Sequence, residues 1–199
     1  MKAQVKVIPL SYYLEEDVLF LGKDLLGKVL CTSIDGQIVK AVITETESYK
    51  GPEDKASHAY QGKKTKRNEI MYHIGGHAYV YICYGMHKLF NIVTGPKDIP
   101  HAVLIRGVMP IEGLDVVERR RGRKEKIIIG PGKISQALGI DKSLNGQDLT
   151  SRVIWLEDHD IKIKKSDIEC LKRVGIDYAE EHAFLDWRFR IKVSVAKSL

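Results

Sequence analysis

Two runs of alternating apolar residues flank Asp35-Gly36, and this pattern constrains the fold more than any other feature of the chain. The runs are KVLCTS (28–33) and QIVKAVITETESY (37–49), and Asp-Gly between such runs predicts a β-hairpin. Because side chains alternate between the two faces of a strand, every second residue of the longer run is predicted to share one face. In order, these residues are Val39, Ala41, Ile43, Glu45, Glu47 and Tyr49. The face that builds the core therefore ends in two carboxylates and a phenol.

The remaining patterns predict a chain in which strands outnumber helices. A first helix is predicted over residues 11–26, with Ser11 as its cap, acidic residues in its early turns and Gly27 as its stop. The other predicted elements are an irregular segment over 50–76, a hairpin over 77–94 with Gly85 near its tip, a strand over 101–108, a helix that begins at Pro110, a short helix over 130–140 that ends at Gly139, and strands near 152–156, 160–164 and 189–195. We expect an α+β fold: a single mixed domain over residues 1–199, with a curved antiparallel β-sheet core, flanking helices and a protruding β-hairpin.

Composition narrows the class of protein. The chain has 44% apolar and 29% charged residues, which is ordinary for a globular domain, and a net charge of +6, which is compatible with a polyanionic partner. Three widely spaced cysteines without a C-x-x-C motif argue against a disulfide framework and a cysteine-rich zinc site. No stretch approaches the roughly 18–20 apolar residues of a membrane span. We therefore expect an intracellular protein without a membrane segment.

Glu47 allows three interpretations. In the first, the strand leaves the core and its carboxylates are exposed, as is usual for acidic residues at strand ends. In the second, Glu47 lies at a pocket wall, where partial desolvation raises its pKa and allows it to act as a general base. In the third, Glu45 and Glu47 share a proton or bind a metal, with Asp54 and His58 as the nearby candidate ligands.

The tyrosines of YVYICYG (79–85) and Arg106 have both structural and functional interpretations. Tyrosine is enriched in strands, so Tyr79 and Tyr81 either belong to a core or line a cavity, with another aromatic residue at an exposed tip. Arg106 is predicted to share a face with Ala102, Leu104 and Val108. A buried guanidinium requires an anionic partner, which is either one of the glutamates or a bound phosphate.

Two basic stretches, KKTKR (63–67) and RRRGRK (119–124), are either solvated faces or phosphate-binding loops. GPGK (130–133) lacks the spacing of a nucleotide P-loop. His73 and His77 have a zinc-like spacing, but the glycine pair between them argues against a helix and no further ligand is near in the sequence.

Taken together and in order, five blocks of the sequence resemble the alkyladenine (3-methyladenine) DNA glycosylase family. They are ETESYKGPEDKASHA (45–59), TKRNEIM (65–71), AYVYICYGMHKLFNIV (78–93), VLIRGVMPIEG (103–113) and GPGKISQALGI (130–140). The tail over residues 175–191 is also similar to the C-terminal segment of that family. The resemblance implies a monofunctional enzyme that flips alkylated or deaminated purines out of duplex DNA and hydrolyses the N-glycosidic bond, which starts base excision repair. The candidate lesions are 3-methyladenine, hypoxanthine and ethenoadenine.

The resemblance also implies roles for individual residues in a base pocket. Glu47 corresponds to the general base that deprotonates the attacking water. Tyr49 and His58 correspond to the residues that stack on one face of the flipped base, and Tyr81 to the residue on the other face. Asn91 corresponds to a residue at the pocket floor that excludes guanine through its 2-amino group. Further residues at matching pocket positions are Ala56 and Leu104.

On the DNA side, the resemblance implies that Tyr84 is a wedge inserted into the minor groove and that Arg106 contacts the backbone of the extruded nucleotide. Further residues at matching DNA-binding positions are Met86, His87, Lys64 and Arg67. His87 departs from the family in one respect, because a tyrosine is also found at this position. The implied partner is double-stranded DNA containing damaged purines, and the implied protein is a monomer without cofactor or metal.

Alkylation at N3 or N7 makes a purine cationic, which favours aromatic partners and lets the base leave without protonation. An uncharged lesion needs an acid that the sequence does not identify. No lysine occupies the Glu47 position, so no strand-cleaving lyase activity is expected. Two rival hypotheses are a non-catalytic nucleic-acid-binding module and a metal-dependent phosphodiesterase built on Glu45, Glu47 and Asp54. A pure binder has no reason to place a carboxylate beside a polyanion.

Overall fold

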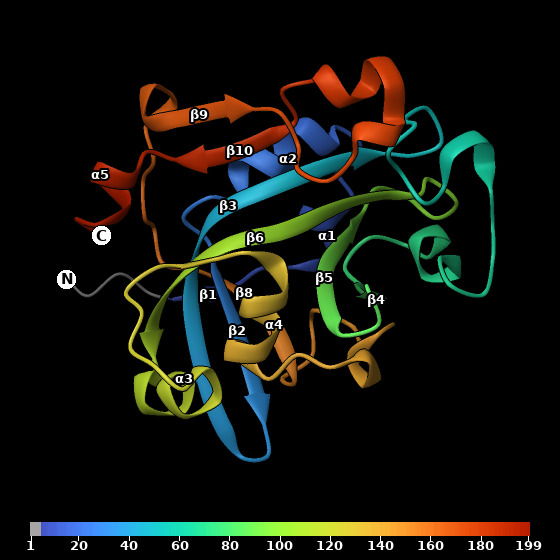
Figure 1. The fold of residues 1–199 in the computed structure, drawn as a ribbon. Helices are drawn as coiled ribbons and strands as arrows, with labels where there is room; N and C mark the ends of the chain where they lie inside the picture. Colours follow the sequence, from blue (N-terminus) through green and yellow to red (C-terminus); the bar gives the residue numbers. More distant parts are fainter. Residues whose placement is uncertain (1–4) are drawn as a thin grey trace.

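The fold is built around one antiparallel β-sheet, which Figure 1 shows in the colours of the sequence. The computed structural model describes residues 5–199 and arranges ten strands in this sheet. Its main path runs β1-β8-β2-β3-β6-β5-β4, while β10 and β9 continue from β3 and β7 pairs with β6. The strands are β1 (Lys6–Val7), β2 (Val29–Ile34), β3 (Gln37–Lys50), β4 (Ala78–Cys83), β5 (His87–Thr94), β6 (His101–Glu112), β7 (Ile128–Ile129), β8 (Ile154–Asp158), β9 (Ile168–Leu171) and β10 (Arg188–Ile191). The predicted α+β class with an antiparallel sheet is confirmed.

The predicted turn at Asp35-Gly36 joins β2 to β3. Both turn residues have positive φ angles, 53° and 73°, which is the geometry that this dipeptide favours. Strand β3 is 14 residues long, and its second half lies between β6 and β10. Here Glu47 faces Leu104 on one side and Arg188 on the other. The interpretation in which this carboxylate is exposed at a strand end is therefore wrong.

A β-bulge interrupts the alternation of β3. Relative to β6, Thr44 is an extra residue in the strand. Before the bulge, Ile43 packs in the main core; after it, Thr46 and Ser48 continue the core-facing row, and their hydroxyls bond to carbonyls of α2 (Val18–Asp24). The prediction that Glu47 shares a face with Ile43 is therefore wrong. A bulge re-aims the side chains that follow it, and here it turns the glutamates toward the opposite face of the sheet.

The helix predicted over residues 11–26 is two short helices, α1 (Leu10–Tyr13) and α2. The Asp17 carboxylate accepts two backbone N–H groups of the first turn of α2, each at 2.9 Å. The acidic residues predicted for the early turns of one helix therefore lie in the connection between α1 and α2. Asp17 starts a new helix there, because its carboxylate bonds to amides that a continuous helix would bond to its own carbonyls. The predicted cap, Ser11, lies inside α1.

The helix predicted to begin at Pro110 begins later. Pro110 belongs to β6, where it pairs with β3 beside a register shift, a position that tolerates a missing N–H group. Helix α3 (Leu114–Arg121) follows Gly113, which has a φ angle of 72°. A Cβ atom on Gly113 would lie 2.4 Å from the carbonyl oxygen of Ile38, so only glycine fits there.

The C-terminal part also differs from the prediction. The strand near 152–156 is present as β8, but residues 160–164 form no strand, because Asp160 adopts a left-handed conformation directly after β8. The segment predicted as one strand over 189–195 divides into β10 and α5 (Val193–Ala196). Strand β9, which the pattern did not predict, pairs with β10 along its whole length.

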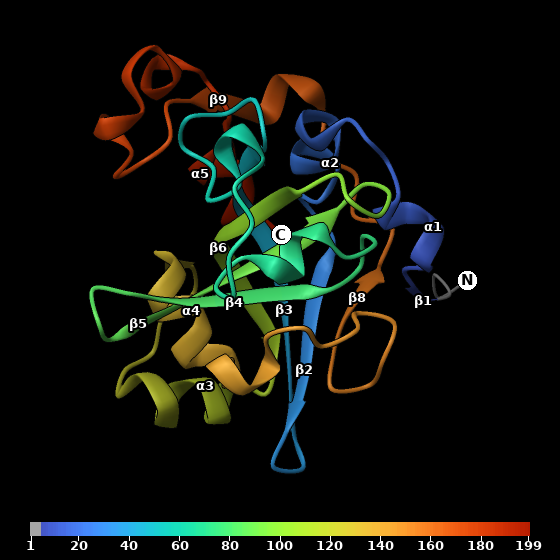
Figure 2. The same cartoon turned by 90° about the vertical axis from the view of Figure 1, so that its right-hand side faces the viewer.

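The second predicted hairpin, β4–β5, projects beyond the sheet, as Figure 2 shows. Helix α4 (Pro131–Leu138) packs against β5 and ends at Gly139, as predicted. Residues 50–76 are irregular apart from two short 3-10 helices, Tyr60–Gly62 and Glu69–Tyr72. The main core joins side chains of the sheet to α2, α3 and α4, and Ile43, Phe90, Ile105 and Phe189 are among its fully buried members. Within the described residues, no helix has the length and apolar character needed to cross a membrane.

Candidate active site

A cavity of about 710 Å³ opens at the edge of the sheet beside the β4–β5 hairpin. Its walls come from β4, β5, β6, the loop over 56–58, the segment over 174–178 and the start of α4. Ten of the twelve predicted pocket and DNA-binding residues line it. They are Tyr49, Ala56, His58, Arg67, Tyr81, Tyr84, His87, Asn91, Leu104 and Arg106. The structure therefore brings together residues from five separate parts of the sequence.

Glu47 lies directly beneath this cavity with a side chain that is 0% exposed. One carboxylate oxygen, Oε1, accepts the backbone N–H of Val174 at 2.9 Å, and Oε2 accepts the Tyr49 hydroxyl at 2.9 Å. The Arg106 Nε atom lies 3.4 Å from Oε1. Burial raises the pKa of Glu47 above its ordinary value, although Arg106 and the two hydrogen bonds oppose the shift. The site therefore holds a carboxylate with increased basicity.

Glu45 is a structural neighbour of this carboxylate. Its Oε1 atom lies 3.0 Å from Nη1 of Arg188 and 3.5 Å from Nε of Arg106. Of the two partners considered for Arg106, a glutamate or a bound phosphate, the described residues provide the glutamate, since its Nε atom lies near both Glu45 and Glu47. Arg106 also lines the cavity. The predicted common face of Arg106 with Val108 is wrong, because Val108 packs in the main core on the other side of the bulge.

Three aromatic residues form one wall of the cavity. The His58 Nδ1 atom lies 2.8 Å from the Tyr79 hydroxyl, and the His58 ring packs edge-on against Tyr81 with 4.7 Å between centroids. Burial, with a smaller contribution from Arg67, lowers the pKa of His58 to about 4. Burial also raises the pKa of Tyr79 to about 12. Both groups are therefore uncharged at neutral pH.

The floor of the cavity lies on the sheet. Asn91 is buried, donates to the Tyr79 carbonyl at 3.1 Å, and pairs across the strands with Leu104. Ala56 is fixed by its N–H group, which donates to the Asp54 carboxylate at 3.0 Å. These contacts hold Asn91 and the Ala56 backbone in place, and the Asn91 amide is the polar group beside apolar Leu104 and Ala56.

The hairpin tip stands at the mouth of the cavity. Tyr84 is 86% exposed and Met86 is 68% exposed, and Tyr84 has a left-handed φ angle of 49°. His87 packs against Gly132 of α4, where a Cβ atom would lie 3.0 Å from the imidazole Nδ1. Met86 lies outside the main cavity and lines a neighbouring one of about 390 Å³. Lys64 also lies outside the main cavity, and its ammonium stacks on the Tyr72 ring at 4.9 Å.

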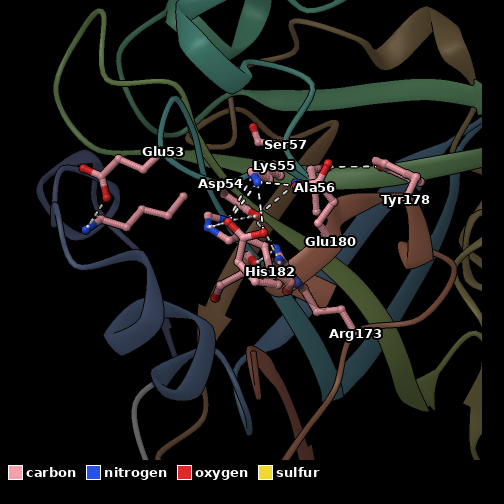
Figure 3. A network of polar contacts seen from close by, with 12 residues as sticks. Glu53, Asp54, Lys55, Ala56, Ser57, Arg173, Tyr178, Glu180 and His182 are labelled. Atoms are coloured by element: carbon pink, nitrogen blue, oxygen red, sulfur yellow. Dashed lines mark hydrogen bonds and ion pairs between the residues drawn. The ribbon is translucent and has the colours of Figure 1, made fainter. Parts of the chain in front are cut away.

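The C-terminal segment contributes a wall of the cavity that was not predicted from the sequence. Arg173, whose side chain is 0% exposed, donates to the Asp54 carboxylate through both terminal nitrogens. Its guanidinium also lies 4.9 Å from the Tyr49 ring centroid. Figure 3 shows the resulting network, in which Asp54, Lys55 and Ala56 of one loop meet Arg173, Tyr178 and His182 of the other. No spacing in the sequence signals this pair, which is 119 residues apart.

The candidate metal ligands form no group of three among residues 5–199, although Glu45 and Glu47 both lie against Arg106. Asp54 is engaged by Arg173 and Glu45 by Arg188, and no three histidine, cysteine or acidic side chains among residues 5–199 gather in a metal-binding group. His73 and His77 do lie close together, with 5.5 Å between their ring centroids. The metal-dependent phosphodiesterase hypothesis therefore loses its structural basis.

A buried carboxylate beneath an aromatic cavity, beside an exposed hairpin tip on a basic protein, fits the class of enzymes that act on single bases of nucleic acids. The model of the methylpurine-DNA glycosylase family matches residues 12–195. A Chlamydia abortus protein is 49% identical over 191 residues, which cover 94% of this chain and 99% of the relative. A Chlamydia felis protein is 46% identical over 197 residues, 97% and 100% of the two chains, and a Natranaerobius thermophilus protein is 46% identical over 185 residues, 90% and 93%. All three carry the name "Putative 3-methyladenine DNA glycosylase".

This chain therefore belongs to the methylpurine-DNA glycosylase family. It is a DNA glycosylase, a hydrolase of N-glycosidic bonds with a function in DNA repair, and its substrate is DNA. The resemblance drawn from the five sequence blocks is confirmed.

Proposed function

We propose that this glycosylase releases alkylated and deaminated purines, 3-methyladenine first among them, from double-stranded DNA by flipping the nucleotide into the cavity and hydrolysing its N-glycosidic bond. The names of the relatives, which refer to 3-methyladenine, support this choice of lesion. We further propose that the chain acts as a monomer and as one glycosylase domain over residues 1–199, of which the first four lie outside the described residues.

The observation that carries this proposal is the Glu47 carboxylate, buried beneath the aromatic cavity with a raised pKa. Each of its oxygens accepts one protein donor, which leaves a lone pair on each for a water molecule. Glu47 takes a proton from that water while the water oxygen bonds to the sugar C1′ atom. The C1′–N bond breaks, and its electron pair leaves with the base. A cationic base needs no proton to leave, so one carboxylate suffices.

The aromatic wall suits a flat base. In the proposed complex the flipped purine stacks between Tyr49 and the wall of His58, Tyr79 and Tyr81, because the His58 and Tyr81 rings contact each other and leave no room for a base between them. This differs from the arrangement that the resemblance implies, in which His58 and Tyr81 lie on opposite faces of the base. Ala56 and Leu104 complete the apolar lining. Asn91 at the floor discriminates against guanine through its 2-amino group. Uncharged His58 and Tyr79 leave the wall without an acid, so an uncharged lesion relies on hydrogen bonds to stabilise the leaving base.

Exposed residues around the cavity suit a duplex partner. We propose that Tyr84 is inserted where the nucleotide leaves the stack, a device by which DNA-bending and base-flipping proteins hold a gap open. Met86 and His87 extend this contact along the hairpin, and Lys64 contacts phosphate. Arg106 both orients Glu47 and contacts the backbone of the flipped nucleotide. The rival binding module leaves the buried Glu47 without a function.

The direct test is base release from duplex oligonucleotides that each contain one lesion, across 3-methyladenine, 7-methylguanine, hypoxanthine and ethenoadenine. We expect release of free 3-methyladenine, which leaves an abasic site in the DNA. The DNA strand should break at this site only on heating in alkali, because no lysine occupies the position of Glu47 to form a Schiff base. Strand breaks without alkali would contradict the monofunctional mechanism. Binding without release of any base would favour the rival module.

Replacing Tyr84 by alanine is expected to weaken binding to lesion-containing and abasic duplexes by about 1–3 kcal/mol, the contribution of one stacked aromatic group. The unfolding temperature should not change, because the Tyr84 side chain is 86% exposed. Fluorescence anisotropy measures the affinity, and Tyr84→Phe is the matched control that keeps the ring. Equal affinities of the alanine variant and the wild type would rule out the wedge.

A further inference from the structure

The charged side chains that line the cavity are all basic, although the proposed substrates include cationic methylpurines. Arg67, Arg106 and Lys133 line it, whereas no carboxylate does, since Glu47 is completely covered. A base that enters the cavity therefore meets only positive and neutral groups before its sugar reaches Glu47. The rings that form the stacking surfaces are the place where these charges act most directly on a base.

Two of the guanidinium groups near those surfaces are neutralised by carboxylates. Arg173 stacks on Tyr49 but is paired with Asp54, and Arg106 lies against Glu45 and Glu47. Lys133 comes from α4, and none of the cation–π contacts among residues 5–199 includes it. Positive charge from these groups is therefore balanced locally or outside cation–π contact with the rings.

Arg67 differs from both. Its Cζ atom lies 5.1 Å from the centroid of the Tyr81 ring, and the side chain is exposed at the cavity. No carboxylate of the described residues lies within 4.0 Å of it, since none of the ion pairs among residues 5–199 includes Arg67. Its charge also contributes to the lowered pKa of His58, where burial is the larger cause. An unneutralised cation thus acts on the aromatic wall.

We infer that Arg67 sets the selectivity of this pocket between positively charged and uncharged purines. The inference rests on the proposed function and moves Arg67 from the DNA-binding residues, where the resemblance places it, to the base pocket. A methylated, cationic purine stacked on Tyr81 is repelled by the neighbouring guanidinium and competes with it for the π-face of the same ring. An uncharged purine suffers no such repulsion, and its carbonyl or ring nitrogen can accept a guanidinium N–H group. Arg67 therefore lowers the preference for cationic lesions.

The test compares single-turnover release of 3-methyladenine, which is cationic in the intact nucleotide, and hypoxanthine, which is uncharged, from otherwise identical duplexes. Neither base carries the 2-amino group against which Asn91 discriminates. Arg67→Gln is expected to raise the ratio of the two rates, cationic over uncharged, by about threefold to tenfold, the range that one partly solvated charge produces at this distance. Arg67→Lys keeps the charge and is expected to keep the ratio close to that of the wild type. Lys64→Gln is the matched control, because Lys64 stacks on a tyrosine outside the cavity.

The outcomes separate the hypotheses. If Arg67 contacts only phosphate, Arg67→Gln lowers both rates alike at subsaturating enzyme, as is expected of Lys64→Gln, and the ratio stays constant; this result would overturn the inference. A wild type that releases neither base removes the proposed function, and the inference with it. Release of both bases by the wild type with an unchanged ratio in Arg67→Gln removes the inference alone. Thermal melting of each variant confirms that the exposed substitution leaves the fold intact.

Discussion

Glu47→Gln is expected to slow base release by about 10²- to 10⁴-fold, the usual contribution of a positioned general base. Glutamine has the same shape and its carbonyl can still accept the Val174 N–H group, but it cannot take a proton from water. Single-turnover release of 3-methyladenine at saturating enzyme measures the chemical step without a contribution from binding. A rate for Glu47→Gln equal to that of the wild type would falsify the assignment of the base.

The pH dependence of the base-release rate is a second test of Glu47 as the general base. The base must be ionised, so the rate should rise as pH increases through the pKa of Glu47, which burial places above its ordinary value of 4.5. The residual rate of Glu47→Gln should lack this limb. Glu45→Gln is the matched control, because Glu45 lies on the same strand beside the same arginine but pairs with Arg188. It should keep the limb and most of the rate.

Glu47→Gln should not destabilise the protein at neutral pH. Because the folded-state pKa of Glu47 is raised, the folded protein binds this proton more tightly than the unfolded chain does. The resulting stabilisation is present below about pH 4.5 and is lost as pH rises through the raised pKa. Glutamine removes the buried charge, so the free energy of unfolding at pH 7 should stay equal or increase. A loss of stability together with a loss of activity would point to a structural role instead.

The second large effect is expected at the pair that joins the two loops of the pocket. Asp54→Asn should lower the free energy of unfolding by about 3–5 kcal/mol, because it leaves the Arg173 guanidinium buried without its counter-charge. Both side chains of the pair are 0% exposed. Urea denaturation followed by circular dichroism measures the change as a lower midpoint with an unchanged slope.

The chain offers a matched surface pair as the control. Arg119 and Asp115 have the same atom separation, 2.8 Å, as Arg173 Nη2 and Asp54 Oδ1, but both side chains are more than half exposed. Asp115→Asn should therefore have a small effect, because water solvates each charge when its partner is removed. Equal effects of Asp54→Asn and Asp115→Asn would contradict the importance of burial. Asp54→Asn should also slow base release, since Arg173 precedes the Val174 N–H group that holds Glu47.

The sequence predicted those turns and helix ends well whose geometry depends on one or two neighbouring residues. Asp35-Gly36 has the two positive φ angles that its hairpin requires, and Gly139 ends α4 in a left-handed conformation. The boundaries that were wrong depend on distant partners. Pro110 stays in a strand because β3 pairs with it, and Asp17 divides the first helix because its carboxylate is free to cap the next one.

The candidate site divides in the same way. Five blocks in the order of the family identified it and predicted Glu47, Tyr49, His58 and Tyr81 as neighbours. The last three line one cavity, and Glu47 is buried beneath it. Side-chain alternation correctly predicted that Glu47 and Tyr49 lie on one side of the strand. It wrongly predicted that Ile43 and the main core lie on that side as well. The bulge at Thr44, which corrects this, depends on the register of β3 against β6.

By itself, the sequence determined the antiparallel α+β class, the two hairpins and the residues from which an aromatic pocket with one carboxylate is made. The fold class and the hairpins follow from turn chemistry and side-chain alternation, which act over a few positions. The pocket residues follow from the resemblance of the five sequence blocks to the glycosylase family. Only the tertiary structure decided that Glu47 is buried, that Val174 and Arg106 hold it, and that Arg173 ties the C-terminal segment to Asp54. These contacts join residues up to 127 positions apart, and burial of a charge is a property of all the elements packed around it.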